Sequence, residues 1–164
     1  MKNLYIDFDG VILDTIDVTY KLIEDLKIDR NNHNEIASFY TNLDWKHLLE
    51  ITPEINDSIN SIKRLLETNL FDIAILTHVY SVSEIVEKVH FIRKFFPTIT
   101  VIPVPKQISK TKMVSAKDSI LIDDYDQNLK EWQEAGGLGI LFSKKLKDKG
   151  FKVIDKLDQI LEVL

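Results

Sequence analysis

Two aspartates one residue apart follow a short apolar run near the start of the chain. The run is Leu4-Tyr5-Ile6, and it leads directly into Asp7-Phe8-Asp9-Gly10. In an extended segment, side chains at i and i+2 point the same way, so Asp7 and Asp9 are expected to face one small volume. Gly10 then allows a sharp backbone turn because it has no Cβ. This stretch is typical of a buried strand that opens into a site.

Carboxylates this close repel each other unless a cation lies between them or one of them keeps its proton. A hard cation such as Mg²⁺ prefers oxygen ligands and often binds substrate phosphate oxygens as well. A carboxylate beside such a metal can also act as a nucleophile and form an aspartyl-phosphate. On this stretch alone, an ordinary turn rich in Asp and Gly is the alternative interpretation.

Two more polar pairs stand where later apolar runs end. Thr77-His78 follow residues 71–76, and Asp123-Asp124 follow residues 119–122. Ligand sites in parallel sheets lie beyond the carboxyl ends of the strands, so these groups are expected to meet Asp7 and Asp9 at one edge. This convergence from three separate strands favours a site over an acidic turn.

Apolar periodicity predicts the elements that must position these groups. Further strands are expected at 99–104, 138–142 and 151–154, and helices at 14–27, 35–40, 44–50, 83–96 and 155–164, with another around Leu129 and Trp132. Pro53 is expected at the first position of a helix that continues to Leu66. Ser83 is expected to cap the helix whose apolar residues are Val86, Val89, Ile92 and Phe96. Alternating strands and helices predict an α/β fold, a Rossmann-like parallel sheet with helices on both faces.

The helices between the first two strands exceed a single crossover connection. We therefore expect a small helical cap at 15–68, inserted after strand 1, with its last part joining the core. Residues 1–14 and 69–164 are expected to form the α/β core.

Composition narrows the class of partner. The 164 residues are 45% apolar and 29% charged, with a net charge of −5 and no cysteine. The charge gives no electrostatic case for binding duplex nucleic acid, and the lack of cysteine excludes disulfides and thiolate metal sites. No apolar run approaches the roughly 20 residues of a membrane span, and no signal segment is evident, so we expect a cytoplasmic protein without a membrane partner.

Taken in order, the motifs resemble the haloacid dehalogenase-like (HAD) superfamily of phosphotransferases. The resemblance rests on Asp7-Phe8-Asp9-Gly10-Val11, Ile75-Leu76-Thr77, a lysine, and Leu121-Ile122-Asp123-Asp124. Within that superfamily, Asn128-Leu129, Trp132 and residues 136–142 make the chain look like the 5′(3′)-deoxyribonucleotidases.

The resemblance implies a role for each motif residue. Asp7 would attack phosphorus and bind Mg²⁺, while Asp9 would protonate the leaving oxygen, activate water and offer its backbone carbonyl to the metal. Thr77 and the backbone N–H of His78 would hold the phosphate. Asp124 would bind the metal directly.

In the same resemblance, Asp123 supports Asp124, and Lys112 balances charge on the transferring group. Lys106, Lys110 and Lys117 are rivals for that role, and only the spacing to the acidic pair favours Lys112.

The substrate is the least determined feature. Phe39, Tyr40 and Trp45 could stack a nucleobase, or they could equally form the cap's own core. We expect a small phosphomonoester, with a nucleoside monophosphate as the first hypothesis and a sugar or other metabolite phosphate as the alternative. A catalytically silent binding protein is a third hypothesis, which the intact motif residues disfavour.

Overall fold

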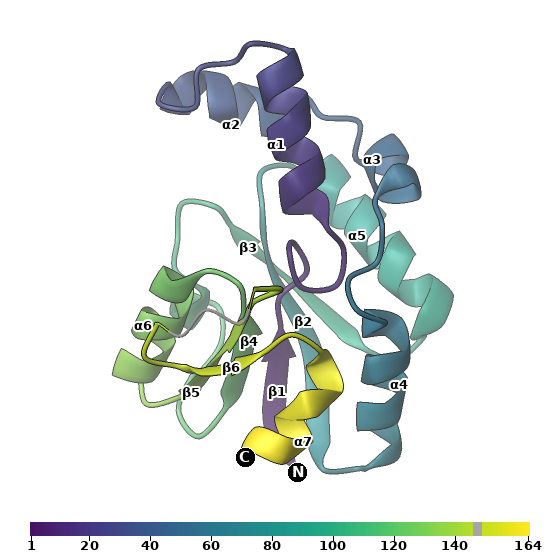
Figure 1. Cartoon of the computed structure of the whole chain (residues 1–164), viewed down its shortest axis with the longest axis vertical. Helices are drawn as coiled ribbons and strands as arrows, with labels where there is room; N and C mark the ends of the chain where they lie inside the picture. The colour runs from purple at the N-terminus through teal and green to yellow at the C-terminus, as the bar shows by residue number, and fades with distance from the viewer. Residues whose placement is uncertain (146–148) are drawn as a thin grey trace.

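The computed structural model describes residues 1–145 and 149–164 (Figure 1). These residues form a six-stranded sheet in the order β3-β2-β1-β4-β5-β6, with every neighbouring pair parallel. The strands are β1 (Lys2–Ile6), β2 (Phe71–Val79), β3 (Thr100–Pro105), β4 (Ile120–Asp123), β5 (Leu138–Phe142) and β6 (Lys152–Ile154). The predicted α/β class with a parallel sheet is confirmed.

The register of the central strands brings the three polar motifs to one edge. Ile6 of β1 pairs with Ile75 of β2 on one side and with Ile122 of β4 on the other. The backbone N–H of Asp7 still donates to the carbonyl of Ile122 at 2.9 Å. The residues that follow these three isoleucines therefore emerge side by side.

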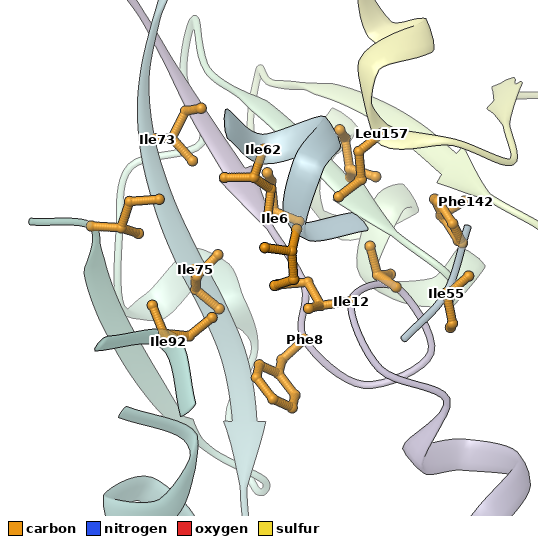
Figure 2. Packing of buried hydrophobic residues seen from close by; sticks show 14 of the residues in the cluster. Ile6, Phe8, Ile12, Ile55, Ile62, Ile73, Ile75, Ile92, Phe142 and Leu157 are labelled. Atoms are coloured by element: carbon orange, nitrogen blue, oxygen red, sulfur yellow. The ribbon is translucent and has the colours of Figure 1, made fainter. Parts of the chain in front are cut away.

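Both faces of the sheet are covered, which explains why β4 and β5 are buried at nearly every position rather than at alternate ones. The helices are α1 (Thr15–Asp25), α2 (His33–Asn42), α3 (Trp45–Ile51), α4 (Ser58–Glu67), α5 (Val82–Phe95), α6 (Asp126–Glu134) and α7 (Ile160–Val163), with 3₁₀ turns η1 (Lys110–Lys112) and η2 (Leu157–Gln159). On one face, Ile6 and Ile75 pack with Ile62 of α4, Ile92 of α5 and Leu157 of η2 (Figure 2). On the other face, α6 packs against the sheet with Leu129 and Trp132.

The segment 15–68 divides into two parts. Helices α1 and α2 project beyond the carboxyl edge of the sheet (Figure 1), and α2 has no fully buried residue. Helix α4 instead belongs to the main core through Ile59, Ile62 and Leu65. Within the described residues, no helix is long and apolar enough to cross a membrane.

The helix expected to begin at Pro53 begins at Ser58 instead. The intervening residues pair with the loop after β1: the Asp14 N–H donates to the Pro53 carbonyl at 2.9 Å, and the Ile55 N–H donates to the Ile12 carbonyl at 3.0 Å. Backbone pairing with the site loop therefore overrides the helix-start signal of Pro53.

The cap of helix α5 lies two residues before the expected position, because Ser81 rather than Ser83 accepts the Glu84 N–H at 3.1 Å. Its buried residues are Glu84, Lys88 and Ile92. Two charged side chains thus lie on the face of the helix that packs inward.

Trp132 supplies the largest side chain of the smaller core. It is fully buried, its ring meets Tyr5 edge-on at 5.4 Å, and its indole N–H donates to the Ser119 carbonyl at 3.3 Å. Trp132→Ala should lower the free energy of unfolding by about 3–5 kcal/mol because it leaves a cavity. Trp132→Phe should cost less, since most of the ring volume remains. Urea denaturation of both variants checks this, and equal losses would contradict a packing role.

Candidate active site

Three carboxylates from two strand ends form a compact cluster. Asp7 follows β1, Asp123 ends β4, and Asp124 comes next; one oxygen from each lies within 4.8 Å of the others. Asp7 and Asp123 are buried. The cluster was predicted from the strand ends, and the structure brings its three members together.

Lys110 is the lysine that neutralises part of this charge. Its buried ammonium donates to Asp7 Oδ1 at 2.8 Å and to Asp123 Oδ2 at 2.6 Å. Burial alone would lower the pKa of Lys110, but the charges of Asp123 and Asp7 outweigh it and raise the pKa. Lys110 is therefore held as a cation.

The structure places Lys110, and not the predicted Lys112, at this position. Lys110 and Lys112 both lie in the 3₁₀ turn η1, and Lys112 is exposed. A 3₁₀ turn has three residues per turn, so side chains at i and i+2 project in different directions. Lys110 faces the cluster, and Lys112 therefore faces away from it.

Asp123 and Asp124 differ in the hydrogen bonds that their carboxylate oxygens accept. Asp123 accepts from Lys110, from the Tyr125 N–H at 2.9 Å and from the Asn128 side-chain amide at 3.0 Å. Within the described part of the chain, no hydrogen bond to the Asp124 carboxylate is found. The Asp124 oxygens therefore remain available for a ligand.

The cluster carries more negative charge than Lys110 offsets. Burial raises the pKa of Asp7 to about 7, against the opposing effect of Lys110. Burial, with the charges of Asp7 and Asp123, raises the pKa of Asp124 to about 8. Three converging carboxylates, of which Asp7 and Asp124 have raised pKa values, are a donor set suited to a hard divalent cation such as Mg²⁺.

Gly10 allows the loop after β1 to approach Asp124. Its φ is +75°, and an added Cβ would lie 2.3 Å from Asp124 Oδ2. The position excludes any side chain for both conformational and steric reasons.

Asp9 lies beside the cluster rather than in it. Its Oδ1 accepts from the Thr15 hydroxyl at 2.7 Å, and its Oδ2 accepts from the Lys88 ammonium at 2.6 Å. The hydroxyl of Thr77 lies 3.5 Å from the same Oδ2. Asp7 and Asp9 thus face the same region, as predicted, with different partners.

The His78 side chain is tied to the loop before Lys110. Its Nε2 lies 2.9 Å from the Ile108 carbonyl, which can only accept, so Nε2 carries the hydrogen. Burial is the main cause that lowers the pKa of His78. The ring lines the cavity described next but does not approach as a free cation.

A cavity of about 480 Å³ opens above the aspartates. Its walls include Tyr20, Arg30, Tyr40, Tyr80 and Lys106, which come from α1, α2 and the loop between them and from the segments after β2 and β3. This volume is in the range of small-molecule sites.

Of the three aromatic residues proposed for substrate stacking, the structure brings two to this cavity. Tyr40 lines it and stacks on Tyr80, with ring centroids 4.8 Å apart and planes 10° apart. Trp45 also borders the cavity but is buried, and its indole N–H donates to the Tyr40 carbonyl at 3.2 Å. Phe39 lines a separate surface hollow with Leu43.

Several residues at the site were not predicted to be there. Lys88 and Glu84 of α5 are buried beside Asp9 and beside each other, at 2.9 Å. The available signal was their i, i+4 spacing in register with Ile92, which places them on the buried face. Thr15 carries no such signal, because its contact depends on how α1 leaves the loop.

The chain has an α/β HAD-like fold. No protein-family model matches the chain, and no curated protein matches it. Solved structures do match. A HAD phosphatase from Thermococcus onnurineus superposes with a TM-score of 0.67 at 15% identity, over 99% of this chain and 97% of that chain.

Two further structures agree. A HAD-superfamily hydrolase of subfamily IA from Geobacter sulfurreducens gives a TM-score of 0.64 at 13% identity, over 100% of both chains. The HAD hydrolase YfnB from Bacillus subtilis, solved with magnesium bound, gives 0.64 at 18% identity, over 99% of this chain and 98% of that chain. At these identities the likeness establishes a HAD-like fold, while the narrower resemblance to deoxyribonucleotidases gains no support from it.

The raised pKa values of Asp7 and Asp124 predict how stability depends on pH. Because both lie above the ordinary value of 3.8, the folded protein binds more protons than the unfolded chain between roughly pH 4 and pH 8. In chelator, the free energy of unfolding should therefore fall as pH rises through this window. Saturating Mg²⁺ should reduce the fall, because it favours the ionised carboxylates.

Urea denaturation at about pH 5 and about pH 8, with chelator and with Mg²⁺, measures this effect. Asp124→Asn is the matched control and should flatten the pH dependence in chelator. An identical pH dependence with and without Mg²⁺ in the wild-type protein would contradict the metal assignment.

Proposed function

We propose that this protein is a Mg²⁺-dependent phosphomonoester hydrolase that acts through an aspartyl-phosphate on Asp7. The observation that supports this most strongly is the cluster of Asp7, Asp123 and Asp124 with Lys110 beneath a cavity of about 480 Å³. Phosphoryl transfer depends mainly on positioning and on neutralising charge, and this arrangement offers both.

Asp7 attacks the phosphorus in this mechanism. Lys110 bonds one of its oxygens and so restricts the side chain to one orientation. Bound Mg²⁺, held by Asp7, Asp124 and the backbone carbonyl of Asp9, would neutralise charge on the transferring group. Asp123 holds Lys110 in place from behind.

Asp9 protonates the leaving oxygen and then takes a proton from the water that cleaves the aspartyl-phosphate. General acid catalysis of this kind is typically worth about 10²–10⁴-fold. The Thr77 hydroxyl and the backbone N–H of His78 hold the phosphate oxygens, while the His78 ring keeps the adjoining loop in place.

For the substrate, we propose a nucleoside monophosphate. The stacked rings of Tyr40 and Tyr80 in the cavity wall support a flat group in the substrate. A sugar or other metabolite phosphate is the second candidate, favoured by the cations Arg30 and Lys106 in the same wall, which suit a second polar or charged group.

A phosphate-release screen over nucleotides and sugar phosphates, with Mg²⁺ or with chelator, tests the proposal. Preferred release from nucleotides supports the first substrate class, and preferred release from sugar phosphates supports the second. Full activity in excess chelator would exclude the metal-dependent mechanism.

Asp7→Asn should reduce phosphate release to background while leaving the fold intact, because an amide does not form the acyl-phosphate. Phosphate release and circular dichroism are measured on the same preparation. Substantial turnover by a folded Asp7→Asn protein would contradict the role of Asp7 as the nucleophile.

The two lysines of η1 offer a matched pair of variants. Lys110→Met should lower kcat by about 10²–10³-fold, the usual cost of removing one donor that stabilises developing charge. Lys112→Met removes the same charge from an exposed position and should leave kcat unchanged. Steady-state kinetics of both variants tests the role of Lys110. A larger loss of kcat for Lys112→Met would instead support Lys112 as the lysine that balances charge on the transferring group.

A further inference from the structure

Lys88 is a fully buried lysine that the mechanism above does not use. It lies on α5, and its ammonium has four oxygen atoms within hydrogen-bonding distance. They are Asp9 Oδ2 at 2.6 Å, Glu84 Oε1 at 2.9 Å, Thr77 Oγ1 at 2.9 Å and the His78 carbonyl at 3.2 Å. An ammonium has three hydrogens, so this group is fully committed to protein acceptors.

These contacts join three separate segments of the chain. Asp9 belongs to the loop after β1, Thr77 to the end of β2, and Glu84 to the first turn of α5. The ammonium also lies 5.1 Å from the ring centroids of both Phe8 and Trp45. Apolar rings and acceptors therefore enclose it on several sides, which leaves little freedom for Lys88 or for the groups it bonds.

A structural role for Lys88 explains only part of this arrangement. Neutralising the buried Glu84 needs a single i, i+4 ion pair, and a buried ion pair is often replaceable by apolar residues without loss of stability. The side chain nevertheless reaches past Glu84 to Asp9, where it makes its shortest contact. The contact with Asp9 affects the orientation of a carboxylate that takes part in the proposed reaction.

The Asp9 carboxylate is held from both sides. Thr15 donates to Oδ1 and Lys88 to Oδ2, so the plane of the carboxylate is set by two donors on different elements. Because an ammonium only donates, Thr77 Oγ1 must be the acceptor in its contact with Lys88. The Thr77 hydroxyl can then donate its hydrogen to Asp9 Oδ2 at 3.5 Å or to the His78 carbonyl at 3.3 Å, which ties Thr77 to the same group of contacts.

We propose that Lys88 is a positioning residue that holds Asp9 in the orientation from which it serves the leaving oxygen. The inference rests on the proposed function, because it assigns Lys88 a role through the acid of that same site. Lys88 touches neither substrate nor metal in this arrangement.

The test compares two phosphomonoesters with different leaving groups. Lys88→Met keeps the length and apolar stem of the side chain but removes its donors. On the best alkyl phosphomonoester from the screen, kcat/KM, which reports the transfer of the phosphoryl group to Asp7, should fall by about 10²–10⁴-fold, the range for loss of general acid catalysis. On p-nitrophenyl phosphate, whose phenolate leaves without a proton, the loss should be at least about tenfold smaller.

Two comparisons separate this role from a merely structural one. Lys94→Met removes an exposed lysine from the same helix and should leave both rates unchanged. In an Asp9→Asn background, Lys88→Met should cause little further loss, because the residue through which it acts is already disabled. Equal losses on the two esters, or losses that multiply in the double variant, would overturn the proposal.

If Lys88→Met does not fold, Lys88→Gln keeps a neutral donor and is judged by the same ratio of losses. Wild-type activity and its loss in Asp7→Asn test the proposed function separately from this ratio. A wild-type protein inactive on both esters would overturn the proposed function, and the role of Lys88 with it.

Discussion

The structure depends on the confinement of like charges at one edge of the sheet. Asp7 and Asp123 are buried there, Asp9 and Asp124 lie half-buried beside them, and such groups repel one another strongly in a medium of low dielectric. Two buried lysines from different elements partly neutralise this negative charge and so reduce the repulsion. Each bonds one aspartate of the first motif and one further acid: Lys110 joins Asp7 to Asp123, and Lys88 joins Asp9 to Glu84.

The sheet makes this confinement unavoidable. Because β1 lies between β2 and β4 in parallel register, residues after Ile6, Ile75 and Ile122 share one edge whatever their charge. The loop after β1 is then fixed from two directions. Gly10 packs directly against Asp124, and residues 12–14 pair with residues 53–55 of the returning chain. A rigid loop is what a site built from like charges requires, since mobile carboxylates would move apart.

Much of this was predictable because it depends on strand ends. Apolar runs that stop at charge identified the edge, and with it Asp7, Asp9, Thr77, Asp123 and Asp124, from sequence alone. The differences between prediction and structure have another origin. Spacing favours Lys112 over Lys110, but the 3₁₀ turn η1 determines which lysine faces the aspartates.

Helix α5 also buries a different face from the one that its apolar residues predict. Val86 is 41% exposed, whereas the charged Glu84 and Lys88 are buried. Apolar periodicity assumes that buried positions are apolar, and it fails where a helix turns its face to a charged site. The contact between Lys88 and Asp9 could not be predicted from the sequence, because the two residues lie 79 positions apart and meet only in the folded chain.

The projecting helices are attached to the core through the same group of charges. The chain enters α1 at Thr15, whose hydroxyl bonds Asp9, and it returns through α3, where the Trp45 ring lies 5.1 Å from the Lys88 ammonium. One connection thus supplies Thr15, which bonds Asp9, and the other packs against Lys88, which also bonds Asp9. A displacement of α1 and α2 relative to the sheet would therefore change the contacts of Thr15 and Trp45. The orientation of Asp9 is for this reason not a local property of its loop, but depends jointly on α5 and on the way the helices above the cavity join the sheet.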